Sequence, residues 1–378
     1  MKLMERPLKV LFVVSNMEIG GVQSGILNFA KVLSPDIVDF DLLVLNNTIG
    51  SQEQKFSKYG SIEHIPTLSS NNRILSIPII LLNNFRIKKL IYEYLKKHSM
   101  YDAVHSKSLM YSASIVEAAK KIGVPVRVAQ SHVDKPKRLN AFHSWYYSWC
   151  SKRIQNNATD KLAVSPGAAE LMFGKFGGRV IKNPTISLKR LNPSLYPKNK
   201  HEGINLIQIG TFSHRKNQTY SVCILSGLLK KGMKAKLTFI GYPLDEPDYI
   251  TEIKNKVHDL GLDNYVEFLP RDSDVPKMLS ESDYMLIPSL REGLPNVALE
   301  AQAMGVPCFI SDSVNPDTDC GLCTFLSLVD GPEKWAETII NDWNQHKGIK
   351  RYVDMTNWDN ECVCQEYIKI WNGCKENL

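Results

Sequence analysis

The stretch "YMLIPSLREGLPNVALEAQAMGVPCFISD", from Tyr284 to Asp312, holds two short apolar runs with a longer periodic segment between them. The runs "YMLIPS" and "PCFISD" are typical of buried strands. Between them, Pro295 suits the first position of a helix, and Gly305 suits its end. The order strand, helix, strand predicts two parallel strands joined by a crossover helix.

The helix expected in this stretch carries a carboxylate on its apolar face. Val297, Ala301 and Met304 recur at i, i+4 and i+7, and Glu300 lies on the same stripe. A buried carboxylate is unfavourable unless a partner meets it. A second carboxylate, Glu292, lies in the loop after the first strand, where parallel sheets bind ligands. The loop amides suit an anion, and the two carboxylates suit hydroxyl groups.

The same alternation fills the rest of the chain in two sets. The first set of predicted strands is "LKVLFVVSN", "DFDLLVLNN", "SIEHIP", "DAVHSKS", "VRVAQSHV" and "KLAVSP", and the second is "INLIQIG", "AKLTFIG", "YVEFLP", "YMLIPS" and "PCFISD". Nearly continuous apolar strands separated by helices predict parallel sheets covered on both faces. We therefore expect an α/β protein with two Rossmann-like, doubly wound domains that face a central cleft.

The expected domains are residues 1–185 and residues 186–355, followed by a closing helix within residues 356–378. The segment "NPTISLKRLNPSLYPKNKHEG" (Asn183–Gly203) is rich in Pro, Asn and Lys and is interpreted as the linker. The closing segment, "WDNECVCQEYIKIWNG", has apolar residues near helical spacing.

Composition argues against a membrane-spanning or secreted protein. The chain is 43% hydrophobic and 22% charged, which is ordinary for a soluble globular protein. The longest apolar run, "ILSIPIILL" (Ile74–Leu82), is shorter than the roughly 18 residues of a membrane span. The N-terminus lacks a signal-peptide pattern, so we expect a cytoplasmic protein with reduced cysteines. Cys320 and Cys323 have CxxC spacing, but no second pair completes a metal site.

Charge is distributed unevenly along the chain. Residues 1–185 hold 25 Lys and Arg against 13 Asp and Glu, whereas the rest of the chain holds 21 against 26. Two basic segments also carry aromatic residues, "NNFRIKKLIYEYLKKHS" (Asn83–Ser99) and "DKPKRLNAFHSWYYSWCSKRIQ" (Asp134–Gln155). Such segments favour an anionic membrane surface, and we expect peripheral association at the inner face of the cytoplasmic membrane. The alternative is that the aromatic residues pack inside the domain and the bases are solvated.

Two loops carry candidate anion-binding residues. "SNMEIGGVQSG" places Gly20 and Gly21 at the start of a helix, where backbone amides can approach an anion. "IGTFSHRKNQ" places Arg215 and Lys216 before another helix, where cations suit a diphosphate. The first loop lacks the G-x-G-x-x-G pattern of dinucleotide folds. A plain tight turn and a solvated basic loop remain the respective alternatives.

Two histidines lie near the ends of predicted strands, His105 in "DAVHS" and His132 in "VAQSH". Residues at the carboxyl ends of strands can reach a ligand in the cleft. A single histidine is more often structural, and this alternative is stronger for His105.

Glu292 and Glu300 have the E-x7-E spacing that is the hallmark of retaining GT-B glycosyltransferases of family 4. With "KMLSESDYMLIPS" and "GPEKWAETI", the stretch resembles bacterial capsule and exopolysaccharide glycosyltransferases, and the resemblance covers nearly the whole chain. It implies a GT-B fold whose closing helix crosses back to the first domain. It also implies transfer of a sugar from a nucleotide-sugar donor to a glycan acceptor, often lipid-linked, with retention of configuration. Members generally need no metal, and we expect no other cofactor and no nucleic-acid partner.

The resemblance assigns roles to individual residues. Glu300 would bind the donor ribose, and Glu292 the donor sugar. Lys216 would bind the phosphates and His132 would lie near the sugar, so Glu292, His132 and Lys216 are the candidate catalytic residues. The remaining donor-binding candidates are Gly20, Gly21, Thr211, Arg215, Gly293, Leu294, Asn296 and Val297.

The chain departs from the family at Thr211, where arginine is usual, and Arg215 is the residue expected to compensate. Because a departing phosphate oxygen can take the acceptor proton, the protein's main task would be to stabilise charge on the leaving diphosphate. Two other functions remain open. A nucleotide-sugar 2-epimerase should carry more acid–base groups around the sugar, and an inactive nucleotide-sugar-binding protein is favoured only by Thr211.

Overall fold

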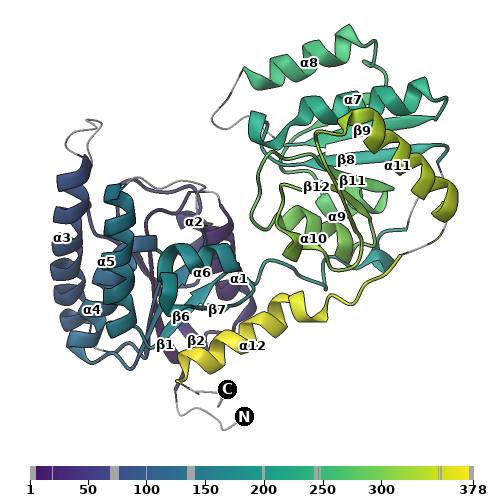
Figure 1. The fold of residues 1–378 in the computed structure, drawn as a ribbon. Helices are drawn as coiled ribbons and strands as arrows, with labels where there is room; N and C mark the ends of the chain where they lie inside the picture. Colours follow the sequence, from purple (N-terminus) through teal and green to yellow (C-terminus); the bar gives the residue numbers. More distant parts are fainter. Residues whose placement is uncertain are drawn as a thin grey trace. The chain divides into compact units, whose positions relative to one another are not determined.

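The computed structural model describes residues 6–373, except Ile19, 69–75, Ser99, 134–140, 198–200, 242–245, Pro247, Gly348 and Lys350. The chain divides into two compact units, drawn in Figure 1. Unit 1 comprises Met1–Thr185 and Trp358–Leu378, and unit 2 comprises Ile186–Asn357. Each unit has its own parallel sheet, as the alternating pattern predicts.

Unit 1 has a seven-stranded sheet in the order β3-β2-β1-β4-β5-β6-β7. Its strands are β1 (Leu8–Val14), β2 (Val38–Val44), β3 (Ile62–His64), β4 (Ala103–Ser106), β5 (Val126–Ser131), β6 (Asp160–Ala163) and β7 (Arg179–Val180). Its helices are α1 (Gly21–Val32), α2 (Glu53–Phe56), α3 (Ser76–Lys97), α4 (Ser112–Ile122), α5 (Ala141–Asn157), α6 (Pro166–Phe173) and α12 (Asn360–Trp371). From Val10 onward β1 is apolar and buried, because helices cover both faces of the sheet.

Helix α12, from the end of the chain, completes the core of unit 1. Its Trp371 ring lies 5.8 Å from the ring of Phe12 in β1 and 5.6 Å from that of Phe40 in β2. Tyr367 lies 4.7 Å from Phe29 of α1, and both side chains are fully buried. Large aromatic side chains contribute strongly to core stability, so unit 1 depends on residues from both ends of the sequence.

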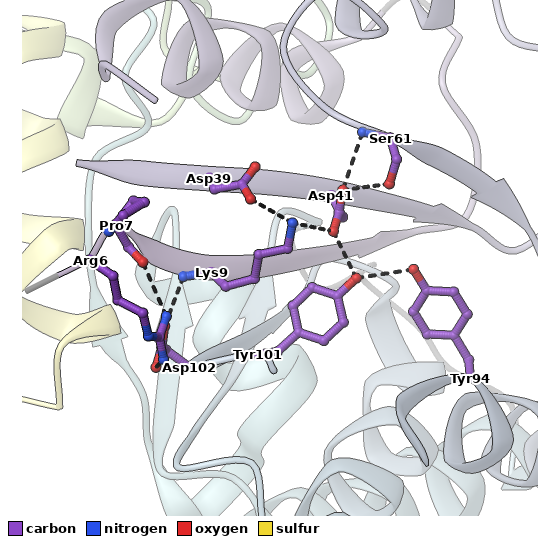
Figure 2. A network of polar contacts seen from close by, with 9 residues as sticks. All are labelled: Arg6, Pro7, Lys9, Asp39, Asp41, Ser61, Tyr94, Tyr101 and Asp102. Carbon is purple, nitrogen blue, oxygen red and sulfur yellow. Dashed lines mark hydrogen bonds and ion pairs between the residues drawn. The ribbon is translucent and has the colours of Figure 1, made fainter. Parts of the chain in front are cut away.

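Figure 2 shows a polar network that ties the start of β1 to β2 and to the segment before β4. Lys9 Nζ lies 2.5 Å from Asp39 and 3.0 Å from Asp41. Tyr101 donates a 2.9 Å hydrogen bond to Asp41. Burial raises the pKa of Asp41, but hydrogen bonds from Ser61, Lys9 and Tyr101 outweigh burial and leave that pKa below its ordinary value. The network therefore stabilises the amino-terminal edge of the sheet with a buried charge that is fully paired.

Unit 2 has a six-stranded sheet in the order β10-β9-β8-β11-β12-β13. Its strands are β8 (Ile204–Ile209), β9 (Ala235–Ile240), β10 (Val266–Leu269), β11 (Tyr284–Ile287), β12 (Cys308–Ser311) and β13 (Cys323–Leu326). Its helices are α7 (Gln218–Lys230), α8 (Tyr249–Asp259), α9 (Val275–Ser280), α10 (Asn296–Ala303) and α11 (Gly331–His346). Both strands of the opening stretch are present, as β11 and β12, and they pair in parallel.

Two details differ from the sequence predictions. Pro295 is the residue before α10 and has an extended ψ of 109°, so the helix begins one residue later than expected. Val297 is only partly buried, because α10 packs instead through Ala298, Leu299, Ala301 and Gln302. Within the segment interpreted as the linker, Ile186 and Leu191 are buried and belong to unit 2.

The strand orders show which loops are positioned to bind a ligand. In unit 1, β1 lies between β2 and β4, and in unit 2, β8 lies between β9 and β11. At such points the connections leave in opposite directions and open a crevice beyond the carboxyl ends of the strands, where ligands bind. Candidate ligand-binding residues therefore follow β1 and β4 in unit 1, and β8 and β11 in unit 2. Across the described residues, no helix is both long and apolar enough to cross a bilayer.

Candidate functional site

In unit 2, the loops after β8 and β11 are joined by hydrogen bonds. The amide of Leu290 donates to the carbonyl of Arg215 at 2.9 Å, and the Asn217 side chain donates to the carbonyl of Pro288 at 3.1 Å. A short 3-10 turn, His214–Lys216, ends at Asn217, which has a left-handed φ of 55°. These contacts hold the two basic side chains of the first loop against the acidic second loop.

The charged cluster consists of Arg215, Lys216 and Glu292. Glu292 forms an ion pair with Lys216, and Arg215 Nη1 lies 3.0 Å from the same carboxylate oxygen. The side chains of Lys216 and Glu292 are only 13% and 10% exposed, whereas that of Arg215 is 50% exposed. The sequence predicts these three residues as neighbours of one ligand, but it does not predict that they pair with one another.

Glycines at the ends of two strands define the path of Lys216. Gly210, directly after β8, has a φ of +151°, and a Cβ there would lie 3.3 Å from Cε of Lys216. A Cβ on Gly241 would lie 1.9 Å from the carbonyl oxygen of Gly210. Both positions therefore require glycine. Thr211 follows as a partly exposed residue, and its carbonyl accepts a 2.9 Å hydrogen bond from Gln218.

Glu300 lies partly exposed on α10, and no hydrogen bond or ion pair meets its carboxylate among the described residues. Burial raises its pKa to about 7, and the positive charge of Arg190 acts in the opposite direction. The backbone amides of Gly293, Leu294 and Val297 likewise donate to no acceptor within the described part of the chain. An uncompensated carboxylate and free donors on the same loop and helix are the features of a site that takes a polar ligand.

In unit 1, the predicted glycines lie at the start of α1. Gly20 precedes the helix and has no side chain with which to cap it. A Cβ on Gly21 would meet nothing within 4 Å, so the fold itself does not demand glycine there. The first turn of α1 carries no acidic residue, which leaves the positive end of the helix dipole uncompensated.

His132 directly follows β5, as predicted, and is partly exposed. His105 lies within β4 and is fully buried, with Nδ1 accepting a 3.2 Å hydrogen bond from Trp371. His105 is therefore a core residue, and the structural alternative is the right one. Its partner is 266 positions away, which no local pattern reveals.

Sequence reasoning missed Lys107, which is 6% exposed beyond the end of β4. Its ammonium lies 2.7 Å from Gln130 Oε1 and 3.4 Å from His132 Nε2. Burial lowers the pKa of Lys107 to about 7. A lysine directly after the buried segment "AVHS" was the available signal, because charged residues are rarely buried without a function or a partner.

No cluster of three or more His, Cys, Asp or Glu side chains suitable for a metal ion occurs among the residues the structure describes. In the charged cluster, positive charge comes from Arg215 and Lys216 instead.

Comparison with known proteins identifies relatives of the whole chain. The profile of the family "Glycosyl transferases group 1" matches residues 197–318, which contain the charged cluster and α10. EpsF of Bacillus subtilis (strain 168), a glycosyltransferase by name, is 28% identical over 88% of this chain and 86% of its own length. CapH of Staphylococcus aureus, named as a capsular polysaccharide biosynthesis glycosyltransferase, is 24% identical over 96% of this chain and 98% of its own.

A third relative is the UDP-Gal:alpha-D-GlcNAc-diphosphoundecaprenol alpha-1,3-galactosyltransferase of Escherichia coli. It is 25% identical over 66% of this chain and 65% of its own length. These relatives confirm the resemblance to capsule and exopolysaccharide glycosyltransferases.

Solved structures agree on the architecture. A glycosyltransferase from Rickettsia africae ESF-5 superposes with a TM-score of 0.75 at 18% identity, over 98% of this chain and 100% of its own. Anabaena HepE, solved in complex with UDP, superposes with a TM-score of 0.69 at 16% identity, over 97% and 98%. At these identities the likeness shows the fold alone, and that fold is GT-B. The chain thus has the GT-B fold, and residues 197–318, within unit 2, match the family "Glycosyl transferases group 1".

Proposed function

We propose that this protein transfers a sugar from a nucleotide-sugar donor to a glycan acceptor, with retention of anomeric configuration, during synthesis of a capsule, exopolysaccharide or related surface glycan. The observation that carries the proposal is the partnerless carboxylate of Glu300 on α10, the helix that follows the loop of Glu292, within the region that matches group 1 glycosyltransferases. The name of EpsF supports the activity, and the name of CapH supports the pathway class.

The donor fits unit 2 by its chemistry. The carboxylate of Glu300 has no hydrogen-bond donor among the described residues, and the ribose hydroxyls can supply one. A diphosphate is an anion, and it can bind to the side chains of Lys216 and Arg215 and to the free backbone amides of Gly293 and Leu294. Glu292 is then left to contact the donor sugar. From unit 1 we propose that Gly20 and Gly21 meet the phosphates and that His132 meets the sugar. In this assignment, Arg215 does the work of the arginine that the family usually has at the position of Thr211.

The proposed reaction needs electrostatic stabilisation more than acid–base catalysis. Charge builds on the leaving diphosphate, and Lys216 and Arg215 would balance it without moving far. A phosphate oxygen of the leaving group takes the acceptor proton, so no protein base is required for that step. We propose that no metal or other cofactor takes part. Transfer should therefore continue at the same rate in excess chelator.

The acceptor is proposed to be a lipid-linked glycan presented at the inner face of the cytoplasmic membrane. In support, the E. coli relative is named for a diphosphoundecaprenol substrate. Unit 1 exposes Leu82 and Phe85 on α3 and Trp145 on α5, with 54%, 66% and 53% of their surface accessible. These helices lie side by side, joined by a 2.7 Å hydrogen bond from Asn84 to Tyr146 (Figure 1). Exposed basic residues on the two helices are Arg86, Lys89, Lys96, Lys97 and Lys152.

Only some of the aromatic side chains of α5 are exposed enough to contact a membrane. Tyr146 is buried, whereas Phe142, Tyr147 and Trp149 are partly buried. Arg153 stacks on Trp149 at 4.5 Å and pairs with Glu117. Inward packing therefore accounts for Tyr146 and in part for Phe142, Tyr147 and Trp149, and Trp145 is the exposed aromatic residue of α5. Lys135, Lys137 and Arg138 lie outside the described residues.

A donor screen tests the proposed function. Thermal shift against UDP-, GDP-, dTDP- and CMP-sugars should give one nucleotide class that raises the melting temperature, since a ligand of the folded state stabilises it by mass action. UDP-sugars come first because HepE was solved with UDP. The selected donor is then incubated with and without a glycan acceptor, and the anomeric configuration of the product is read by NMR.

Each outcome of that screen discriminates. Transfer with retained configuration supports the proposal. A C2-epimerised sugar without transfer would indicate a 2-epimerase. Binding without transfer or donor hydrolysis would indicate an inactive nucleotide-sugar-binding protein, and absence of any stabilising nucleotide would contradict all three.

A further inference from the structure

A buried cluster of polar side chains lies at the carboxyl edge of the sheet in unit 1. It joins His105 of β4, Lys107 after β4, Gln130 of β5, His132 after β5 and Tyr367 of α12. Gln130 Oε1 accepts from His105 Nε2 at 2.9 Å and from Lys107 Nζ at 2.7 Å, and Gln130 Nε2 donates to Tyr367 at 2.7 Å. We asked what these contacts require of the protons in the cluster.

His105 has one tautomer that satisfies its neighbours. The indole N–H of Trp371 is only a donor, so the Nδ1 atom of His105 must accept from it. The proton of His105 is then on Nε2, where it donates to Gln130 Oε1. This fixes Gln130 with its oxygen toward Lys107, which is the arrangement that an ammonium group requires.

The same reasoning determines the tautomer of His132. Lys107 Nζ lies 3.4 Å from His132 Nε2, and a lysine ammonium can only donate. His132 Nε2 must therefore accept, which places the proton on Nδ1. The other neighbour of Nδ1 is the amide group of Asn183, with Nδ2 at 3.4 Å and Oδ1 buried without a partner. A half-turn of that amide presents Oδ1 to the Nδ1–H of His132 and removes the orphan acceptor.

Burial disfavours the ammonium form of Lys107 and lowers its pKa to about 7, but the aromatic rings around it act in the opposite direction. Its Nζ lies 5.5 to 5.9 Å from the ring centroids of Phe29, Phe12 and Tyr367, where cation–π attraction acts. The titratable groups that face it are His105 from β4, His132 after β5 and Tyr367 from α12. No carboxylate pairs with it among the described residues.

We infer that Lys107 is a positioning residue for His132: it holds the imidazole neutral, with its proton on Nδ1 and directed to Asn183. Burial is the largest cause that keeps the pKa of His132 well below its ordinary value, and the positive charge of Lys107 and the neighbouring His105 act in the same direction. A neutral, oriented imidazole is a fixed polar surface rather than a second cation. That this surface faces a donor sugar rests on the proposed function, whereas the state of the ring does not.

NMR of the full-length protein labelled with ¹⁵N-histidine tests the inference directly. The ring nitrogen shifts report which nitrogen carries the proton, and the His132→Gln variant assigns the signals by their loss. At pH 6, below the pKa of about 7 for Lys107, wild-type His132 is expected to be neutral with the proton on Nδ1. A proton on Nε2, or an imidazolium, would overturn the inference without recourse to any variant.

The Lys107→Met substitution should then remove the constraint on the protonation state of the His132 imidazole. The methionine keeps the apolar stem but removes the donor and the charge, so the pKa of His132 should rise by about one unit or more and the Nδ1 preference should weaken. Lys9→Met is the matched control, because it removes a half-buried lysine near the amino-terminal ends of the strands of the same sheet, away from His132. It should lower stability and leave His132 unchanged. If Lys107→Met is folded and His132 keeps its pKa and tautomer, Lys107 does not position it.

Activity separates this inference from the proposed function. If His132 meets the sugar, Lys107→Met should lower kcat and leave the affinity for free nucleotide unchanged. If the donor screen finds no nucleotide but the tautomer is as stated, only the function fails. If donor transfer is confirmed but the tautomer is not, only the role of Lys107 fails.

Discussion

Glu292 forms an ion pair with Lys216 across the two loops that follow β8 and β11. The pair neutralises a cation that a diphosphate would otherwise attract, and Arg215 shares the same carboxylate oxygen at 3.0 Å. Glu292 and an anionic ligand therefore compete for the same two basic side chains. In the proposed function, Glu292 thus has two effects: it weakens the hold on the released nucleotide and it contacts the sugar.

Glu292→Gln should lower the rate of sugar transfer far more than it changes nucleotide binding. The amide keeps the shape of the side chain but loses the charge that pairs with Lys216, so affinity for the free nucleotide diphosphate should stay level or rise. Turnover and calorimetric affinity measured on the same preparation check this. Glu267→Gln, on exposed β10, is the charge-matched control. Wild-type turnover in Glu292→Gln would rule out the role at the sugar.

Glu300→Ala should weaken both donor and free nucleotide. A ribose hydroxyl would lose its acceptor, which costs on the order of 1–3 kcal/mol of binding free energy. Titration calorimetry with the nucleotide selected by the screen measures the loss. Glu252→Ala, an exposed acid on α8, should bind normally. Unchanged nucleotide affinity in a folded Glu300→Ala protein would refute the assignment.

Glu300→Gln should stabilise the protein in a pH-dependent way. Burial raises the pKa of Glu300 from about 4.5 to about 7, so the folded state holds its proton more tightly than the unfolded chain. Stability is therefore lost as the pH rises through that window, and the penalty is fully present above pH 7. The glutamine removes it. The difference in melting temperature between variant and wild type should be larger at pH 8 than at pH 4.5, and a constant difference would contradict the argument.

Asp41→Asn should destabilise unit 1 at neutral pH by about 1–3 kcal/mol, because Lys9 and Tyr101 lose the buried carboxylate that joins them. Hydrogen bonds hold the pKa of Asp41 below its ordinary value of 3.8 despite burial. Its contribution is therefore present above that value and disappears as the pH falls through the lower folded pKa. The gap between wild type and variant should close in acid. Asp39→Asn, whose side chain is 41% exposed, should cost less.

Binding to anionic vesicles should depend on the exposed apolar residues of unit 1. Replacing Phe85 and Trp145 with serine should reduce co-sedimentation with phosphatidylglycerol vesicles at low salt, because both side chains favour the membrane interface. Lys135, Lys137 and Arg138 changed to glutamine should do the same, and added salt should release the wild type. Tyr265→Ser, an exposed aromatic residue of unit 2, should have no effect. If the wild type fails to sediment at all, a soluble acceptor is the better interpretation.

The sequence predicts the fold well because buried parallel strands form nearly continuous apolar runs. β1, β5, β8 and β11 all appear where such runs occur. The sequence does not predict β13, because "CTFL" is a short segment that lies at the edge of the sheet and is only partly buried. β7 is two residues long, which is too short for any periodic pattern.

The site was predicted only as far as loop position allows. Glu292, Lys216 and His132 could be placed because they follow apolar runs. Their partners could not, since the ion pair of Glu292 and the contact of Lys107 with His132 join loops far apart in the sequence. Lys107 also shows why burial matters: its position in "HSKS" looks like an exposed turn until α1 and α12 cover it.

The place of α12 has a consequence for synthesis on the ribosome. Trp371 and Tyr367 fill the core around Phe12, Phe29 and Phe40, yet they are made after all of unit 2. Domains usually fold as they emerge, the N-terminal one first. Here unit 2, whose residues are contiguous, can finish first, while the nascent unit 1 waits with an apolar groove for the last helix. A chain cut short before residue 360 and released from the ribosome would therefore combine a folded second unit with a first unit that chaperones still recognise.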